Sequence, residues 1–469
     1  MYNRQHLHFV GIGGVGMAGI AEVLLNLGYT VSGSDLKRSA LTDHLVSLGA
    51  TVVFGHAPEN VPQDTSVIVI SSAVNMLNPE LVIASERRIP IIPRAEMLGE
   101  LMRMKYGIAV AGSHGKTTTT SMTAKILRDT GLDPTVIIGG RVLSQQSGAS
   151  LGMGDYLVAE ADESDGSFCL LSPAIAVVTN IDREHMGHYG SFGALEAAFA
   201  EFMSKVPFYG IVIACCDDPI VARVAKGLKR RVLPYGFSPE NYISAKDIEP
   251  CGATTNFTLM VDGKESGRCE LPMLGSHMVS NSLAAIAVGL ELGVYPEEAC
   301  RALESFSGVA RRAELVWRGK EVMILDDYGH HPREILATLL AMKRAWVGYK
   351  RESRSNDQSL GRLIVVFQPH RYSRTQELFS EFLTSFGDAD ELLLMDIYSA
   401  GEQPISGISG EGLAAAVQHP NVVFTPTLED VQAALLERAR PGDVIVTMGA
   451  GNVWQVGKQI APMLEKMGL

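Results

Sequence analysis

The chain has 469 residues, of which 46% are hydrophobic and 20% are charged, a composition typical of a folded globular protein with two to four domains. A net charge of −12 disfavours nucleic acid and acidic membranes as partners. No apolar run approaches the roughly 20 residues that span a bilayer, and the first strand expected begins too early to leave room for a signal peptide. We therefore expect a cytoplasmic protein of three domains.

The cysteines form no CxxC pair and no cluster with histidine, which favours a reduced protein without structural zinc. We expect most of them to be buried apolar side chains. The six are Cys169, Cys215, Cys216, Cys251, Cys269 and Cys300.

The first segment, residues 1–103, opens with a strand, a glycine turn and a helix. The strand covers residues 6–10, the helix 17–27, and a second strand 30–35. The turn contains Gly11, Gly13, Gly14 and Gly16. Acidic Asp35 follows about 20 residues later, which completes a Rossmann-like fingerprint for a nucleotide diphosphate. The fingerprint identifies a nucleotide-diphosphate site better than it identifies NAD, and an NAD-dependent dehydrogenase is the alternative for this segment. Asp35 could instead serve only as a capping or turn residue.

Two more strands are expected at residues 51–54 and 67–71. The second leads into a small polar loop that contains Ser71 and Ser72, at the sheet edge where open α/β sheets bind ligands. Residues 101–107 carry basic side chains, and we expect them to form a linker.

The second segment, residues 104–313, begins with a phosphate-binding pattern. An apolar strand at 108–111 precedes a helix that includes 121–127. Between them lie Gly112, Ser113, His114, Gly115, Lys116, Thr117 and Thr118. Glycines let the backbone approach an anion, Lys116 can neutralise phosphates, and the Thr117 hydroxyl can bind Mg²⁺. The loop is shorter than the usual motif, because Val110 stands where its first glycine belongs; the alternative is a glycine-capped turn with an exposed lysine.

Further strands at 155–160, 174–179 and 208–214 alternate with helices, which predicts a mostly parallel sheet. Glu160 ends one strand and His185 follows the next, so both side chains can reach a divalent ion at the same edge as Thr117. The alternatives are a solvated carboxylate for Glu160 and a hydrogen-bonded loop histidine for His185.

The third segment, residues 314–469, contains two polar loops that follow apolar strands. The first runs from 326 to 332, and Pro332 should begin the next helix. The second runs from 368 to 375, and Arg371 and Arg374 would share a helix face suited to a carboxylate or phosphate. A solvated helix start is the alternative. The strands expected here are 322–325, 363–367, 391–396, 422–425 and 444–448.

Taken together, five motifs in one order resemble the Mur ligases of peptidoglycan synthesis over essentially the whole chain. They are Gly112-Ser-His-Gly-Lys-Thr, Glu160-Ala-Asp-Glu-Ser-Asp, Asn180 to His185, Asp326-Asp-Tyr-Gly-His-His-Pro and Gln368-Pro-His-Arg-Tyr-Ser-Arg-Thr. The nearest resemblance is to the branch that adds L-alanine to UDP-N-acetylmuramic acid.

This resemblance implies an α/β protein of three domains. Residues 1–103 would form a Rossmann-like domain that binds the UDP-sugar, through Gly11, Gly13, Gly14, Gly16, Asp35, Ser71 and Ser72. Residues 104–313 would form a P-loop-type ATPase domain with a mostly parallel sheet. Residues 314–469 would form a second Rossmann-like domain that holds the amino acid and nucleotide.

The resemblance also assigns roles to single residues. ATP would contact Gly112, Ser113, His114, Gly115, Lys116, Thr117 and Thr118, together with Asn281 and Arg312 (or Arg311). The metal, Mg²⁺ with Mn²⁺ as an alternative, would be held by Thr117, Glu160 and His185. Tyr328, His330, Arg371 and Arg374 would face the amino acid and the lactyl end, and Lys116, His330, Arg371 and Arg374 would be catalytic. His277 would lie near adenine, in a stretch that departs from the family's usual pattern; Ser113 replaces the more usual threonine.

The activity implied is ATP-dependent amide-bond formation through an acyl phosphate, in a monomer or homodimer. A ligase that adds a preformed peptide to the same sugar nucleotide is the nearest alternative. A non-catalytic nucleotide-binding protein is a more distant one.

Overall fold

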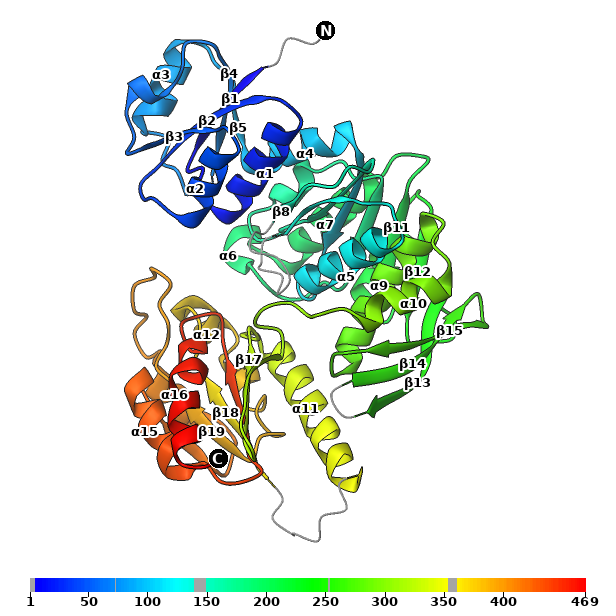
Figure 1. Cartoon of the computed structure of the whole chain (residues 1–469), viewed down its shortest axis with the longest axis vertical. Coiled ribbons are helices and arrows are strands. Elements are labelled where there is room, and N and C mark those ends of the chain that lie inside the picture. Colours follow the sequence, from blue (N-terminus) through cyan, green and yellow to red (C-terminus); the bar gives the residue numbers. More distant parts are fainter. Residues whose placement is uncertain (1–4, 72, 139–148, 252–253, 353–360) are drawn as a thin grey trace. The chain divides into compact units, whose positions relative to one another are not determined.

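The computed structural model describes residues 5–71, 73–138, 149–251, 254–352 and 361–469. Within them the strands form three sheets, of five, ten and six strands, flanked by helices (Figure 1). The predicted α/β class with mostly parallel sheets is confirmed. The chain forms two compact units: the second comprises residues 248–256, 271–278 and 308–469, and the first comprises the rest. The domain boundaries at residues 103 and 313 remain predictions.

The first sheet is entirely parallel, with the order β3-β2-β1-β4-β5. Its strands are β1 (His6–Val10), β2 (Thr30–Asp35), β3 (Thr51–Phe54), β4 (Thr65–Ile70) and β5 (Ile91–Pro93). Its helices are α1 (Val15–Asn26), α2 (Ala40–Ser47), α3 (Pro79–Glu86) and α4 (Arg94–Met104). The strand order reverses between β1 and β4, and ligands of such sheets bind beyond the carboxyl ends of the strands at this point.

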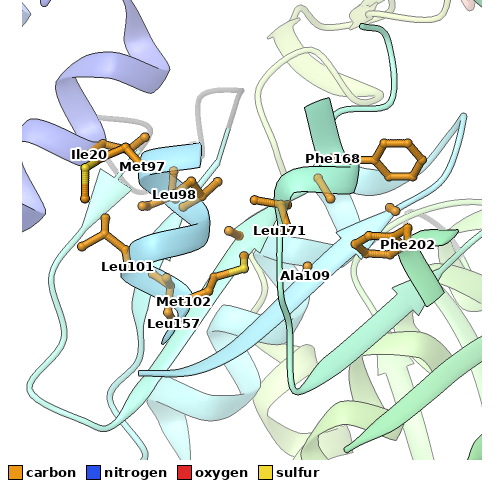
Figure 2. Packing of buried hydrophobic residues seen from close by; sticks show 14 of the residues in the cluster. Ile20, Met97, Leu98, Leu101, Met102, Ala109, Leu157, Phe168, Leu171 and Phe202 are labelled. Atoms are coloured by element: carbon orange, nitrogen blue, oxygen red, sulfur yellow. The ribbon is translucent and has the colours of Figure 1, made fainter. Parts of the chain in front are cut away.

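The prediction of a linker at residues 101–107 is wrong. Helix α4 continues to Met104, and β6 begins at Tyr106. Met97, Leu98, Leu101 and Met102 are buried, and Figure 2 shows them among the apolar side chains of the core of the first unit. Their spacing along the helix places them on one face, whereas basic Arg103 is exposed. The amphipathic pattern therefore outweighs the local basic character.

The second sheet has the order β15-β14-β13-β12-β11-β10-β6-β9-β7-β8, and its section from β7 to β13 is parallel. Its strands are β6 (Tyr106–Ala111), β7 (Thr135–Ile137), β8 (Ala149–Ser150), β9 (Tyr156–Glu160), β10 (Ile175–Val178), β11 (Ile211–Cys215), β12 (Val232–Gly236), β13 (Ile243–Cys251), β14 (Thr254–Val261) and β15 (Lys264–Leu271). Its helices are α5 (Lys116–Asp129), α6 (Met186–Tyr189), α7 (Phe192–Ser204), α8 (Pro219–Lys226), α9 (Ser276–Glu291) and α10 (Pro296–Glu304).

Two of the six cysteines form a disulfide, so the expectation of a fully reduced chain is wrong. Cys269 on β15 and Cys300 on α10 are bonded, with their Cα atoms 4.9 Å apart. The two residues are 31 positions apart in the sequence, and the folded arrangement of β15 and α10 brings them together. Cys169, Cys215, Cys216 and Cys251 are free thiols.

The third sheet has the order β16-β17-β21-β18-β19-β20, parallel except for the β16–β17 pair. Its strands are β16 (Glu314–Arg318), β17 (Met323–Asp327), β18 (Leu363–Phe367), β19 (Glu391–Leu394), β20 (Val422–Phe424) and β21 (Val444–Met448). Its helices are α11 (Pro332–Glu352), α12 (Tyr372–Glu377), α13 (Phe379–Phe382), α14 (Gly410–Ala416), α15 (Leu428–Arg438) and α16 (Trp454–Lys466). Alternate residues of β18 enter separate hydrophobic clusters on the two faces, which explains its uninterrupted apolar sequence. Among the described residues, no helix has the length and apolar character needed to cross a membrane.

Candidate active site

The phosphate loop connects β6 to α5 through two glycines whose backbone conformations disfavour other residues. Gly112 has a φ of 139° and Gly115 a φ of 83°. A β-carbon at Gly112 would lie 2.0 Å from the Thr179 hydroxyl oxygen, so a side chain there would clash. One at Gly115 would lie 2.5 Å from Oδ1 of Asn281, which places that predicted ATP residue against the loop.

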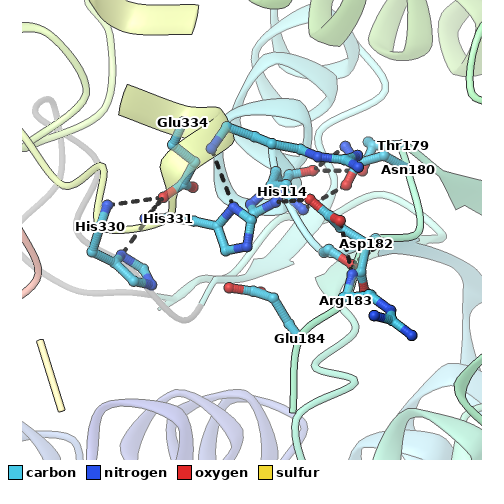
Figure 3. Close-up of polar contacts among 12 residues, drawn as sticks. His114, Thr179, Asn180, Asp182, Arg183, Glu184, His330, His331 and Glu334 are labelled. Atoms are coloured by element: carbon cyan, nitrogen blue, oxygen red, sulfur yellow. Dashed lines mark hydrogen bonds and ion pairs between the residues drawn. The ribbon is translucent and has the colours of Figure 1, made fainter. Parts of the chain in front are cut away.

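The loop is fixed by polar residues that follow β10, the strand beside β6. The N–H of His114 donates to Asn180 Oδ1 at 2.8 Å, and Asn180 Nδ2 donates back to the His114 carbonyl at 3.0 Å. The Thr179 hydroxyl donates to the same carbonyl at 2.6 Å, and the Ser113 hydroxyl accepts from the Asp182 N–H at 2.8 Å. Figure 3 shows His114 with Thr179, Asn180 and Asp182. The contacts of Thr179, Asn180 and Asp182 with the loop were not predicted from the sequence, where the only signal is that these polar residues follow an apolar strand.

Lys116 begins α5 and is held by backbone and carboxylate oxygens. Its Nζ donates to the carbonyls of Gly112 and Ser113 at 2.6 and 3.2 Å, and it lies 2.8 Å from Glu163 Oε2. Burial lowers the pKa of Lys116, but the negative charges of Glu163 and Glu160 outweigh burial and leave the pKa above its usual value. Lys116 is therefore charged at neutral pH. Its pairing with Glu163 was not predicted from the sequence.

Two groups of side chains that could hold a metal ion lie at this sheet edge. The Thr117 hydroxyl donates to Glu160 at 3.0 Å, because β9 lies beside β6 and both strands end there. His185 belongs to a second group, in which donor atoms of Glu163, Glu184 and His185 lie within 4.8 Å of one another. Hard oxygen donors with one imidazole are compatible with Mg²⁺ or Mn²⁺. Thr118, also predicted to bind ATP, is 2% exposed.

The glycine turn of the first sheet is held mainly by backbone groups and one carboxylate. Gly11 has a φ of 82°, and its N–H donates to the Ser34 carbonyl at 2.8 Å. The Gly13 N–H donates to Asp35 Oδ2 at 2.8 Å. Asp35 therefore supports the turn, which agrees with the alternative that it is a turn residue. No contact among the described residues tests whether Asp35 also binds a ribose.

The other residues predicted to bind UDP lie in the same turn or beside it. Gly14 is the N-cap of α1, and in the described part of the chain no side chain caps this helix, so its first N–H groups can face an anion. A β-carbon at Gly16 would lie 2.7 Å from an Arg94 nitrogen, and one at Gly11 would lie 3.6 Å from the Ser71 β-carbon. Ser72 lies outside the described residues.

In the second unit, the loops that follow β17 and β18 bring several predicted substrate residues together. His330 Nδ1 lies 3.0 Å from the Tyr328 carbonyl oxygen, and the His330 and His370 rings are 6.0 Å apart. Arg374 Nη1 lies 3.4 Å from His370 Nδ1. Burial, with the charge of Arg374, lowers the pKa of His330 to about 3 and that of His370 to about 4. Both imidazoles are therefore neutral near pH 7, beside a guanidinium.

The arginines of this unit differ from the prediction in one respect. Pro332 begins α11 as expected, but Arg371 has a φ of 72° and precedes α12, so Arg371 and Arg374 do not share a helix face. The Arg371 N–H donates to the Tyr398 carbonyl at 2.8 Å, which holds the backbone out of the helix. Arg312 lies over the Tyr328 ring, with Cζ 5.4 Å from the centroid. His277 also belongs to this unit, and burial lowers its pKa to about 4.

Models of three protein-family domains match successive parts of the chain. Residues 6–106 match "Mur ligase family, catalytic domain", residues 110–289 match "Mur ligase middle domain", and residues 311–451 match "Mur ligase, glutamate ligase domain". Together these matches span most of the sequence.

Curated relatives match over nearly their full lengths. The chain is 52% identical to the UDP-N-acetylmuramate–L-alanine ligase of Geobacter sp. (strain M21), with 99% of both chains covered. It is 50% identical to the enzyme of that name from Syntrophotalea carbinolica, with 99% of this chain and 100% of the relative covered. The solved UDP-N-acetylmuramate–alanine ligase from Thermotoga maritima superposes with a TM-score of 0.77 at 25% identity, over 98% of this chain and 99% of that one.

Proposed function

This chain belongs to the Mur ligase family, and we propose that it joins L-alanine to the lactyl carboxylate of UDP-N-acetylmuramic acid, with conversion of ATP to ADP and phosphate. The proposed setting is cytoplasmic synthesis of peptidoglycan precursors. The observation that carries the proposal is the convergence of Lys116, Thr117 and Glu160 on a glycine-bounded phosphate loop. A dehydrogenase would leave this loop without a role.

The proposed reaction proceeds in two chemical steps. An oxygen of the substrate carboxylate attacks the γ-phosphorus of ATP, the bond from that phosphorus to the β–γ bridging oxygen breaks, and ADP leaves. The alanine nitrogen then attacks the acyl carbon, the nitrogen loses its proton, and phosphate leaves as the tetrahedral intermediate collapses. Phosphorylation is needed because a carboxylate by itself has no good leaving group.

The protein's contribution at the phosphate loop is alignment and charge stabilisation. Lys116 would leave its contact with Glu163 to neutralise the transferred phosphoryl group. A divalent cation would be held by Thr117 and Glu160, with Glu163, Glu184 and His185 nearby. When bound, this cation supplies positive charge that offsets the triphosphate.

We further propose that the second unit binds the amino acid. Arg374, beside the neutral imidazoles of His330 and His370, would pair with a carboxylate, and the unprotonated ring nitrogens can accept hydrogen bonds from an amine. Arg371 is exposed and would add a second guanidinium. Tyr328 would contribute its ring, which already carries two arginines on its surface.

The test measures phosphate release with ATP and Mg²⁺ while the other substrates are added in turn. We expect release only when UDP-N-acetylmuramic acid and L-alanine are both present, with one amide formed per phosphate. Stimulation by a peptide in place of L-alanine would favour the peptide-adding branch. Slow release that no amine stimulates would indicate a nucleotide-binding protein without ligase activity.

A further inference from the structure

A buried acidic side chain lies behind the glycine turn of the first sheet and has no role in the proposed chemistry. Glu80 belongs to the first turn of α3, where its N–H donates to the Asn78 side chain at 2.9 Å. Its side chain is fully buried. Burial of a carboxylate is unfavourable unless hydrogen bonds compensate for the lost contacts with water, so Glu80 must be stabilised by donors within the protein.

Each carboxylate oxygen of Glu80 has several donors. Oε2 accepts from the Ser34 hydroxyl at 2.6 Å and lies 3.2 Å from His8 Nε2. Oε1 accepts from Asn60 Nδ2 at 2.7 Å and lies 3.3 Å from His56 Nδ1. Burial alone would raise the pKa of Glu80, but the hydrogen bonds from His8, Ser34 and Asn60 outweigh burial and lower the pKa to about 2. Glu80 is therefore a charged acceptor in a polar cluster.

Ser34 connects this cluster directly to the glycine turn. Its hydroxyl donates to Glu80, while its backbone carbonyl accepts the N–H groups of Gly11 and Ile12 at 2.8 and 3.0 Å. The turn is thus separated from the buried carboxylate by one residue. A displacement of Ser34 would shift the first residues of the turn.

A second series of hydrogen bonds connects the other carboxylate oxygen of Glu80 to the turn. Asn60 Nδ2 also donates to the Gly55 carbonyl at 3.0 Å, and the Gly55 N–H donates to the Asp35 carbonyl at 2.9 Å. The Asp35 side chain in turn accepts the Gly13 N–H at 2.8 Å. The two series of hydrogen bonds end at successive residues of β2, Ser34 and Asp35. Ser34 holds the first residues of the turn, and Asp35 holds Gly13.

We propose that Glu80 is a positioning residue for the sugar-nucleotide site, which holds the Gly11–Gly16 turn in the conformation that receives the pyrophosphate. The inference rests on the proposed function, because that function assigns the UDP moiety to this turn. Backbone N–H groups stabilise an anion only when they already point at it, so a loosened turn loses affinity for the sugar nucleotide. Steps that follow binding are not affected.

The experiment compares Glu80→Gln with Leu81→Ala in the full-length protein. Glutamine keeps the size of the side chain but removes its charge and turns one acceptor into a donor that faces other donors. Leu81 is the neighbouring residue of α3 and is 1% exposed, so its truncation disturbs packing at the same place without touching the cluster. KM and kcat are measured for all three substrates, and UDP binding is measured by titration calorimetry.

We expect Glu80→Gln to raise KM for UDP-N-acetylmuramic acid and Kd for UDP about tenfold, the loss expected when a hydrogen bond to a charged group is removed. kcat and KM for ATP and L-alanine should stay within about twofold of wild type, because only the turn moves. Leu81→Ala should lower thermal stability without this selective change in KM. Ser34→Ala should raise the same KM, because it removes the hydroxyl that links Glu80 to the turn.

The outcomes separate the two proposals. Failure of the wild-type chain to bind UDP or UDP-N-acetylmuramic acid would overturn the proposed function, and the inference with it. Normal wild-type binding combined with unchanged KM in Glu80→Gln, or with equal changes in Glu80→Gln and Leu81→Ala, would overturn the inference alone. If Glu80→Gln does not fold, Ser34→Ala decides, and an unchanged KM in that variant overturns the inference.

Discussion

The two glycine turns of the first unit share a backbone design but differ in where charge is placed. Each follows a buried parallel strand and leads into a helix, β1 to α1 and β6 to α5. At the first turn two carboxylates, Asp35 and Glu80, support the backbone from behind, and the Arg94 guanidinium lies beside Gly16. At the second, Lys116 stands at the start of the helix among carboxylates that can release it.

This difference in charge distinguishes a turn that binds a substrate from a turn that takes part in phosphoryl transfer. A turn that only holds a diphosphate needs backbone N–H groups in fixed positions, which buried hydrogen bonds provide. A turn that transfers a phosphoryl group needs a positive charge at the site where negative charge moves. Substitutions at the second turn should therefore affect kcat, and substitutions at the first should affect sugar-nucleotide binding.

The largest effect is expected for Lys116→Ala. Loss of the charge should reduce kcat for phosphate release by about 10²–10³-fold, as for other preorganised charge-stabilising groups. Because the substitution leaves the buried Glu163 unpaired, the double variant Lys116→Ala/Glu163→Gln should recover thermal stability but not activity. Lys125→Ala, which removes an exposed pair with Asp129 on the same helix, is the control. Near-normal turnover in Lys116→Ala would contradict the assignment of this turn to phosphoryl transfer.

Acid should weaken the first turn as the Glu80 carboxylate takes up a proton. The pKa of Glu80 is about 2 when folded against 4.5 for the free side chain, so its contribution is complete above pH 4.5 and is lost as the pH falls toward 2. The shift corresponds to about 3 kcal/mol. The pKa of Lys116 is raised, so the positive charge of Lys116 itself is lost only as the pH rises above 10.5.

Hydrogen exchange of the β1 and β2 amides measures this local stability in a protein with more than one unit. Wild type should lose protection between pH 4.5 and 2 more steeply than Glu80→Gln. His8 and His56 face the side chain at position 80 in both proteins, so their own titration is common to the two profiles. Parallel pH profiles for the two proteins would show that Glu80 does not stabilise the turn through its charge.

Glu160→Gln should weaken the response to Mg²⁺. The amide retains one oxygen but loses the negative charge beside Thr117, so the Mg²⁺ concentration for half-maximal activity should rise roughly tenfold or more. High Mg²⁺ should restore most of the activity. Glu196→Gln, at an exposed pair with Arg223, should leave the Mg²⁺ titration unchanged. Equal Mg²⁺ requirements in Glu160→Gln and wild type would remove Glu160 from the metal site.

The smallest effect is expected for Asp35→Asn. The amide oxygen can still accept the Gly13 N–H, but the bond is no longer charge-assisted, a difference of about 1 kcal/mol. KM for UDP-N-acetylmuramic acid should rise about fivefold while kcat is unchanged. Steady-state kinetics with varied sugar nucleotide measure this. A fall in kcat of the same size would mean that the first turn contributes to chemistry, and the contrast between the two turns would fail.

Local sequence patterns predicted both turns and most of the strands around them. A strand, a glycine turn and a helix in succession can be recognised from neighbouring residues alone. The strands expected at 6–10, 30–35 and 363–367 have these bounds in the structure. The same reasoning predicted that Glu160 and Thr117 meet, because parallel strands end at one edge of a sheet. The linker at 101–107 was wrong because basic composition was given more weight than helical periodicity.

The tertiary structure alone decided which distant side chains meet. Lys116 and Glu163 are 47 residues apart, Ser34 and Glu80 are 46, and Cys269 and Cys300 are 31. None of these pairs belongs to a local repeat, because each is formed where the sheets bring separate loops and helices together. Strand, turn and helix depend on backbone preferences within a few residues, whereas the charge environment of a site depends on contacts that form only when the chain folds.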